Sequence, residues 1–149
     1  MLASGYTGPA EIAGTIAKLF PSNRNEVYIL DVSAGTGLCA DKVYSQGFLK
    51  IDALEPSNEM LDEARKKGIY SRYFVDGLGE NTLDIANGGY IINATLHSLF
   101  PADGDATAAL FRENIKTLES EGKWNQVEFR RLSQAVLGED GALSVHKVL

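Results

Sequence analysis

The sequence predicts a single α/β domain, residues 1–149, built on a doubly wound sheet, and three patterns lead to this prediction. Short apolar runs alternate with amphipathic segments in the first half of the chain, as in parallel strands covered by helices. Glycine or proline stands at the ends of most of these segments, where helices stop or turns form. The last two apolar runs are joined by the turn 138–141, which is so short that it forces an antiparallel pair. The length suits one domain, because domains usually have roughly 100–200 residues.

In the first half, helices and strands are expected to alternate. Gly8-Pro9 begins a helix, because proline fits the first turn, and Pro21 ends it. The nearly unbroken apolar run 27–32 is expected to be a strand buried on both faces. Ser57 is the expected N-cap of a helix that Gly68 ends. The remaining expected elements are a helix over 38–46 and strands over 49–54 and 70–75.

The second half is expected to complete the sheet with antiparallel strands. A strand over 90–95 follows the turn Gly88-Gly89, and Asp105 caps the next helix. Two strands, over 127–137 and 142–149, follow as the hairpin. The sheet is therefore expected to be mixed, mostly parallel with an antiparallel hairpin at its C-terminal end.

Composition and charge exclude several classes of protein. The 14 basic and 20 acidic residues give a net charge of −6, which disfavours binding to the phosphate backbone of nucleic acids. No apolar run approaches the roughly 20 residues of a membrane helix, and the first residues do not resemble a signal peptide. The single cysteine, Cys39, excludes an internal disulfide, and no group of side chains has the spacing of metal ligands. These features favour a cytoplasmic protein without a metal, and they leave a nuclear location open.

The residues most informative about function form a turn after the first strand. The segment Asp31-Val32-Ser33-Ala34-Gly35-Thr36-Gly37 lies at the carboxyl end of this strand, where open α/β sheets bind ligands. Gly35 and Gly37 allow the backbone to approach a ligand closely, and the following helix N-terminus offers free N–H groups to an anion. Glu55 ends the second strand, twenty positions after Gly35, where a carboxylate can accept both hydroxyls of a ribose.

Two classes of adenosine-containing ligand fit this pattern. Residues 35–40 match the G-x-G-x-x-G/A fingerprint of dinucleotide-binding proteins, which makes NAD one candidate. Asp31 favours the other candidate, S-adenosylmethionine (SAM), because the amino group of the methionine part is positively charged. A pyrophosphate gains nothing from a carboxylate four residues before the first glycine of the turn.

Two segments resemble the class I SAM-dependent methyltransferases. Residues 29–38, Ile-Leu-Asp-Val-Ser-Ala-Gly-Thr-Gly-Leu, are similar to motif I of that family, and residues 52–61 are similar to the segment after it. Within the family, the sequence is most similar to the methyltransferase-like proteins of the Williams–Beuren region type, on Gly5-Tyr6-x-Gly8-Pro9 and on 64–70 and 118–124. The resemblance implies a Rossmann-like, doubly wound sheet of the class I type, SAM as the cofactor and methyl transfer as the activity.

The resemblance also assigns parts of SAM to individual residues. Asp31, Gly35 and Gly37 would hold the methionine part. Glu55 would hold the ribose hydroxyls, and Met60 would cover one face of the adenine. The complete set of cofactor-binding residues that it implies is Tyr6, Asp31, Ser33, Gly35, Gly37, Glu55, Pro56, Ser57, Met60, Asp76 and Gly77.

Residues outside the turn take part by the same resemblance, and one residue within it departs from the family. Tyr6 would close over the donor, and Asp76-Gly77 would lie by the adenine amino group. Ser33 stands where the family usually has its first glycine. A serine is small, but its Cβ carries an energetic cost if the position needs a positive φ.

A larger departure is the short connection after the third strand. Only ten residues, 78–87, precede the glycine pair, where the family has a fourth strand and its helix. A strand with a crossover helix needs on the order of 30 residues, so a reduced number of strands is expected. Two hypotheses follow. Segment 90–95 pairs with the first strand in a smaller sheet, or the chain is a shortened, destabilised variant of a longer active protein.

No catalytic residue follows from the sequence. His97 is a candidate general base on the ligand side of the sheet, but without a partner carboxylate a surface role is favoured. His146, in the last strand, is interpreted as structural. The methyl acceptor, a small molecule or a protein, is not identified. Two alternatives stay open: a non-catalytic SAM-binding or structural protein, and an NAD-dependent oxidoreductase, which Asp31 disfavours.

Overall fold

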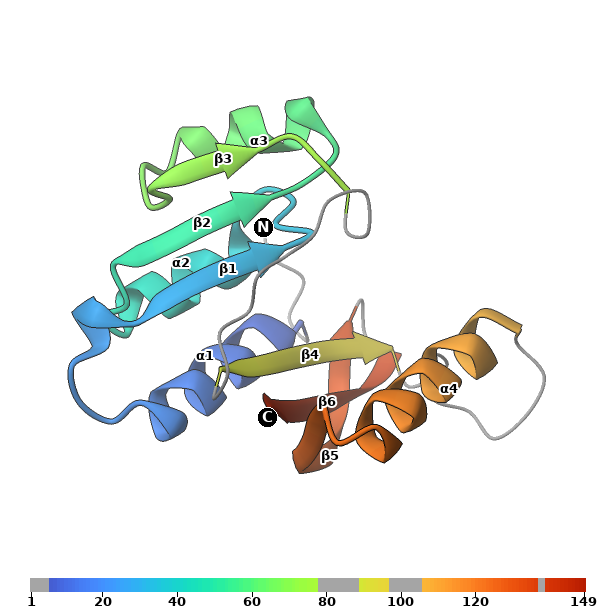
Figure 1. The fold of residues 1–149 in the computed structure, drawn as a ribbon. Helices are drawn as coiled ribbons and strands as arrows, with labels where there is room; N and C mark the ends of the chain where they lie inside the picture. The colour runs from blue at the N-terminus through green and yellow to red at the C-terminus, as the bar shows by residue number, and fades with distance from the viewer. Residues whose placement is uncertain (1–5, 78–88, 97–105, 137–138) are drawn as a thin grey trace. The chain divides into compact units, whose positions relative to one another are not determined.

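The computed structural model describes residues 6–77, 89–96, 106–136 and 139–149 (Figure 1). These residues belong to two compact units. The N-terminal unit comprises residues 9–83, and the C-terminal unit comprises residues 84–149 together with residues 1–8. No helix in the described part of the chain is long and apolar enough to span a membrane.

The N-terminal unit alternates helices and strands, as the sequence predicts. Its helices are α1 (Gly8–Leu19), α2 (Leu38–Ser45) and α3 (Asn58–Arg65). Its strands are β1 (Tyr28–Val32), β2 (Lys50–Leu54) and β3 (Arg72–Phe74). A short 3-10 helix, η1 (Arg24–Glu26), precedes β1 and does not follow from the sequence pattern.

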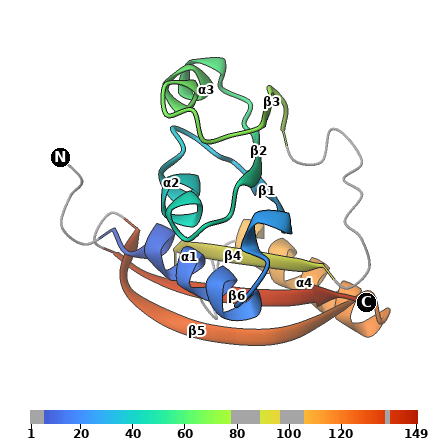
Figure 2. The same cartoon turned by 90° about the vertical axis from the view of Figure 1, so that its left-hand side faces the viewer.

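These three strands form a parallel sheet in the order β1-β2-β3. Helices α2 and α3 lie on the same face of this sheet (Figure 2). The central strand β2 is buried from Ile51 to Leu54, and Leu61 and Ala64 of α3 are fully buried. The core of this unit therefore lies between β2 and the helices, and the carboxyl ends of all three strands share one edge.

Strand β1 is less buried than the sequence predicts. Tyr28 is 55% exposed, and the other four residues of β1 are half-buried, so the prediction of a strand buried on both faces is wrong for this segment. Within the described residues β1 pairs with β2 alone. A strand at the edge of a sheet keeps more contact with solvent than a central strand, which explains the difference.

The C-terminal unit is an antiparallel sheet with one helix. Its elements are β4 (Tyr90–Leu96), α4 (Ala106–Ser120), β5 (Trp124–Val136) and β6 (Glu139–Val148). The strand order is β4-β6-β5, and both pairings are antiparallel, which confirms the predicted hairpin.

A β-bulge interrupts the pairing of β5 with β6. Gln126 faces His146 and Glu128 faces Val145, so Val127 is an extra residue in β5 without a register partner. Such a bulge changes which side chains of the strand point to a given face.

Strand β4 pairs with β6 along its whole length, from Tyr90 opposite Lys147 to Leu96 opposite Gly141. Pairing of segment 90–95 with the first strand stays a hypothesis, because β1 and β4 belong to different units and β6 occupies only one edge of β4. The predictions for Asp105, for the connection 78–87 and for His97 lie outside the described residues.

Candidate functional site

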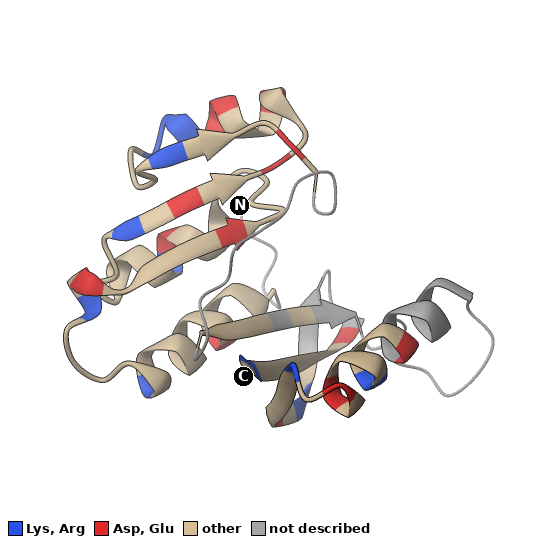
Figure 3. Cartoon of the chain, in the orientation of Figure 1, with Lys and Arg blue, Asp and Glu red and all other residues tan. Residues whose placement is uncertain are grey.

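Asp31 and Glu55 lie at the same edge of the parallel sheet. Asp31 is opposite Ala53 in the β1–β2 register, and Glu55 directly follows β2. Backbone hydrogen bonds extend the sheet past the strands, because Ala34 N–H donates to Leu54 O at 3.2 Å and Glu55 N–H donates to Phe74 O at 3.0 Å. Acidic residues lie along both β1 and β2 (Figure 3). The parallel register thus brings together two carboxylates that are 24 positions apart in the sequence.

The Glu55 carboxylate links two loops. Its side chain is buried, its Oε2 accepts a hydrogen bond from Gly35 N–H at 3.0 Å, and its Oε1 accepts one from Ser57 N–H at 3.0 Å. Gly35 belongs to the turn after β1, and Ser57 is the residue before α3. A buried carboxylate requires hydrogen-bond donors, and here the backbone supplies two of them.

The Asp31 carboxylate is held by Tyr70. The Tyr70 Oη donates a hydrogen bond to Asp31 Oδ2 at 2.7 Å, and Tyr70 is buried. Burial raises the pKa of Asp31, the negative charge of Glu55 raises it further, and the hydrogen bond from Tyr70 opposes both effects. Burial and the nearby Asp31 charge in turn raise the pKa of Tyr70, so this phenol stays protonated and remains a donor.

The turn after β1 has three residues with positive φ. They are Ser33 at 58°, Gly35 at 54° and Gly37 at 79°. A positive φ carries an energetic cost for a serine, and the backbone at Ser33 has this conformation. A Cβ on Gly37 would lie 3.1 Å from the Tyr70 ring, so a larger side chain at this position would displace Tyr70.

The start of α3 borders the same turn. Ser57 caps the helix as predicted, because its Oγ accepts a hydrogen bond from Met60 N–H at 3.3 Å. Met60 is 47% exposed, and its sulfur lies 3.9 Å from the position of a Cβ on Gly35. An exposed methionine beside a glycine turn can pack against the face of a ring. Pro56 is exposed.

The remaining predicted site residues, Asp76, Gly77 and Tyr6, lie in different parts of the fold. Asp76 follows β3, and its Oδ1 accepts a hydrogen bond from Gly77 N–H at 2.8 Å. Both residues are half-buried. Tyr6 belongs to the C-terminal unit and is 39% exposed, so its predicted contact with the donor stays a prediction.

Sequence reasoning missed two residues beside the turn, Tyr70 and Lys67. The Lys67 Nζ donates a hydrogen bond to Gly37 O at 3.3 Å. The sequence pattern indicates Tyr70 only as the start of a strand, although a buried tyrosine usually needs a hydrogen-bond partner. Burial and the Asp31 charge raise the pKa of the Cys39 thiol to about 12, which disfavours the nucleophilic thiolate at neutral pH.

Comparison with known proteins gives one curated relative and many similar structures, and no family model matches the chain. Over 85 residues the chain is 31% identical to methyltransferase-like protein 27 of Homo sapiens, a match that covers 57% of this chain and 35% of that protein. The chain thus spans about a third of the length of this relative.

A SAM-dependent methyltransferase of Leishmania major superposes on 95% of this chain and 73% of its own, with a TM-score of 0.63 and 15% identity. The fold is that of the SAM-dependent methyltransferases. This methyltransferase fold confirms the predicted class, a mixed α/β architecture with a parallel sheet and an antiparallel hairpin. A further similar structure is aTrm5 in complex with tRNALeu, with a TM-score of 0.63 and 15% identity over 94% of this chain and 45% of that chain.

Proposed function

We propose that this chain binds SAM at the carboxyl ends of β1, β2 and β3 and acts as a SAM-dependent methyltransferase domain over residues 1–149. The observation that carries the proposal is the meeting of Asp31 and Glu55 at one edge of the sheet. The proposed contacts are the set that the resemblance implies: Tyr6, Asp31, Ser33, Gly35, Gly37, Glu55, Pro56, Ser57, Met60, Asp76 and Gly77.

The charges at this edge fit a ligand that carries a cation. Asp31 is half-buried, and this burial and the charge of Glu55 raise the pKa of its carboxyl group. A positively charged amino group next to Asp31 would offset this repulsion, because opposite charges favour the ionised form of a carboxyl group. The pyrophosphate of NAD would add negative charge beside both carboxylates, which disfavours the oxidoreductase alternative.

In this proposal the chain orients the methyl donor and does little chemistry itself. SAM, when bound, supplies an electrophilic methyl group on a sulfonium centre. Asp31 Oδ1 would accept from the amino group, because Tyr70 occupies Oδ2. The N–H groups at the start of α2 would face the carboxylate of the methionine part. Positioning of this kind can supply much of the rate acceleration when the acceptor is a good nucleophile.

The Glu55 carboxylate has enough acceptor positions to bind both ribose hydroxyls. Each oxygen of its carboxylate accepts one backbone N–H, and a carboxylate has about four acceptor positions. Each oxygen can therefore accept one ribose hydroxyl while Gly35 and Ser57 keep their hydrogen bonds. Met60, exposed beside Gly35, would cover one face of the adenine.

The acceptor is proposed to be a small molecule or a protein. The net charge of −6 disfavours a nucleic acid, although one protein with a similar structure is seen with tRNALeu, so tRNA belongs among the acceptors to be tested. A cytoplasmic location is part of the same proposal. A chain that binds SAM and transfers no methyl group to any acceptor class would support the non-catalytic alternative.

Isothermal titration calorimetry on the full chain tests the donor site. We expect binding of SAM and of its demethylated product and no binding of NADH. Glu55→Gln removes a charge-assisted acceptor and should weaken SAM binding about 10- to 100-fold, since a hydrogen bond to a charged group contributes roughly 1.5–3 kcal/mol.

Glu63→Gln is the matched control, because Glu63 is an exposed residue of α3 that pairs with Lys66. This control should bind SAM like the unaltered chain. Binding of NADH alone, or equal affinity for SAM in both variants, would refute the proposed site. Transfer of a labelled methyl group from SAM to small molecules, proteins or tRNA then decides between enzyme and non-catalytic binder.

A further inference from the structure

The C-terminal unit contains a cavity that the proposed function does not use. It has a volume of about 180 Å³ and lies between α4 and the strands β5 and β6. Ser144 and His146 of β6 line it and are each only 2% exposed. Among the described residues, Ser144 Oγ and His146 Nε2 have no hydrogen-bond partner. Buried polar atoms are nearly always satisfied in native proteins, so two such atoms at one cavity are groups that a bound molecule or water can satisfy.

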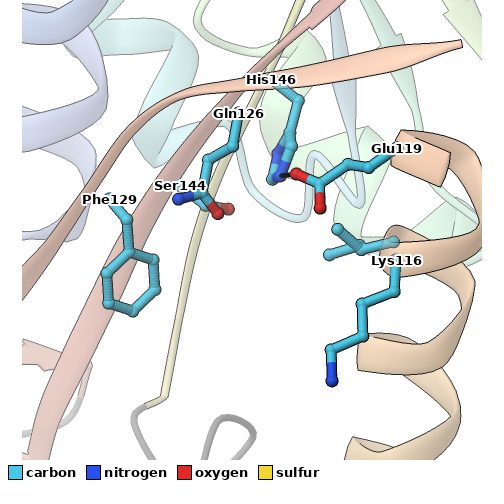
Figure 4. Close-up of a pocket in the computed structure, with 7 residues that line it drawn as sticks. Lys116, Glu119, Gln126, Phe129, Ser144 and His146 are labelled. Carbon is cyan, nitrogen blue, oxygen red and sulfur yellow. Dashed lines mark ion pairs between the residues drawn. The ribbon is translucent and has the colours of Figure 1, made fainter. Parts of the chain in front are cut away.

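The β-bulge at Val127 shapes the same cavity. In a regular strand, residues two apart share a face, so Gln126 and Phe129 would point to opposite sides of β5. The bulge places Gln126 opposite His146 and Phe129 opposite Ser144, and both side chains line the cavity. Figure 4 shows them together with Ser144 and His146, facing α4. Bulges that redirect side chains are frequent next to functional sites.

Helix α4 supplies an acceptor on the opposite wall. Glu119 Oε1 lies 3.8 Å from His146 Nε2, which is too far for a hydrogen bond (Figure 4). Burial lowers the pKa of His146, against the opposing effect of Glu119, so the imidazole is neutral near pH 7. Ile115 adds an apolar contact, and Lys116 is exposed at the rim. The walls thus combine an apolar part, a carboxylate and two unsatisfied polar atoms.

The volume limits the size of a ligand. Pockets for drug-sized molecules have roughly 300–1,000 Å³, whereas an engineered cavity of roughly 150 Å³ binds benzene. The cavity of about 180 Å³ opens to solvent at the exposed Phe129 side chain and has room for one aromatic ring. The Phe129 side chain, 45% exposed, provides a surface for an edge or stacking contact with such a ring.

We propose that this cavity binds a one-ring aromatic molecule with adjacent hydroxyl donors, of the catechol type. One hydroxyl donates to the Glu119 carboxylate and accepts from His146 Nε2, and the other exchanges a hydrogen bond with Ser144 Oγ. This site does not depend on SAM binding, because all of its residues belong to the C-terminal unit.

Nuclear magnetic resonance on the nitrogen-labelled full chain tests the proposal with catechol as the probe. The chain has a single tryptophan, Trp124, whose ring centroid lies 5.5 Å from that of His146. Its indole N–H is therefore an unambiguous reporter of occupancy. We expect a saturable shift of this signal with catechol, and at least tenfold weaker binding of benzene and of benzoate, which lack the hydroxyl donors.

Two variants and one control separate the site from general adsorption. Ser144→Ala should weaken catechol binding about fivefold, as expected for one lost hydrogen bond, and Glu119→Gln about tenfold. Ser133→Ala is the control, because Ser133 is an exposed serine of β5 outside the cavity. If the Ser144→Ala variant does not fold, the catechol affinity of the Glu119→Gln variant serves as the test.

Several outcomes would overturn the proposal. The absence of a Trp124 shift at millimolar catechol would mean that water alone fills the cavity. Equal binding of catechol and benzene would mean that the buried polar atoms take no part. Equal weakening by Ser144→Ala and Ser133→Ala, or unchanged affinity in a folded Glu119→Gln variant, would place the binding elsewhere.

Discussion

At Asp31, folding and ligand binding make opposite demands on one carboxyl group. Burial and the Glu55 charge raise its pKa, which means that the folded chain holds the proton more tightly than the unfolded chain. This preference stabilises the folded state at pH values below the raised pKa, and the stabilisation is lost as the pH rises through it. At neutral pH the ionised Asp31 is therefore a cost to folding. A site that is built for a ligand often carries such a cost.

The variant Asp31→Asn is expected to separate the two demands. The amide oxygen can still accept the hydrogen bond from Tyr70, and the buried charge is gone, so the melting temperature at pH 7 should equal or exceed that of the unaltered chain. SAM affinity should fall about 10- to 100-fold, because a charge-assisted partner is lost. Differential scanning fluorimetry and calorimetry measure the two effects.

The pH profile is the internal control for this variant. In the unaltered chain SAM affinity should weaken as the pH falls through the raised Asp31 pKa, because the protonated group no longer attracts the amino group. Asp31→Asn should lack this dependence. Asp62→Asn, in an exposed ion pair with Arg65, should retain it. An acidic limb that persists in Asp31→Asn would contradict the assignment.

Ser33 offers a prediction about backbone strain. Its φ of 58° lies in the left-handed region, which costs roughly 1–2 kcal/mol for a residue with a Cβ. Ser33→Gly removes this cost but adds flexibility to the unfolded chain, worth roughly 0.4–1 kcal/mol, so a net gain of about 0.5–1 kcal/mol is expected. Urea unfolding measures it. Asn23→Gly, at a φ of 52°, should gain less, because asparagine tolerates this region, and an equal gain would argue against the explanation.

The sequence predicts most of the donor site because its chemistry is local in the chain. The glycine turn, the acidic end of β2 and the Ser57 cap are each defined by a few neighbouring residues. The role of Tyr70 could not be predicted in this way. Its hydrogen bond to Asp31 joins residues 39 positions apart and depends on how β3 packs. The cavity around His146 could not be predicted in this way either. Its polar atoms converge through sheet register and a bulge, and periodicity alone does not show a bulge.

At the scale of elements, α1 contains a glycine that a helix does not need. Gly14 lies within Gly8–Leu19, and a Cβ built on it meets no atom within 4 Å. Gly14→Ala should therefore stabilise the fold by about 0.5–1 kcal/mol, the usual preference for alanine inside a helix. Chemical denaturation gives the difference.

The contrasting variant is Gly37→Ala. The φ of 79° and the 3.1 Å approach to the Tyr70 ring should make this change destabilising by more than about 1 kcal/mol. The Gly14→Ala and Gly37→Ala variants are thus expected to change the free energy of unfolding in opposite directions. A gain in stability at Gly37 would contradict the packing of Tyr70 under the turn.

Helices and strands that follow regular sequence patterns can be predicted, but the elements that pack or pair with them cannot. Alternation and stop residues place α2 and α3 in the sequence, and each lies where expected. The exposure of β1 is not predictable from its apolar residues, because burial depends on which strands adjoin it. The partner of β4 is unpredictable for the same reason. A short strand of apolar residues carries no information about its neighbour.

At the scale of the whole molecule, the proposed donor contacts are unevenly distributed. All of them except Tyr6 lie in the N-terminal unit. Saturating SAM should therefore slow amide hydrogen exchange mainly within residues 9–77, above all in the turn 33–37 and at the start of α3. Mass spectrometry of the exchanged chain measures this. Equal protection of the strands β5 and β6 would show that the ligand stabilises both units alike.

The carboxylate of Glu55 also bears on how quickly the donor arrives. Its hydrogen bonds to Gly35 and Ser57 already link the turn after β1 to the start of α3 before any SAM is bound. Little rearrangement then precedes capture, and association should follow a single exponential whose rate rises linearly with donor concentration. Loss of these two hydrogen bonds would introduce a slow conformational phase whose rate does not depend on the SAM concentration.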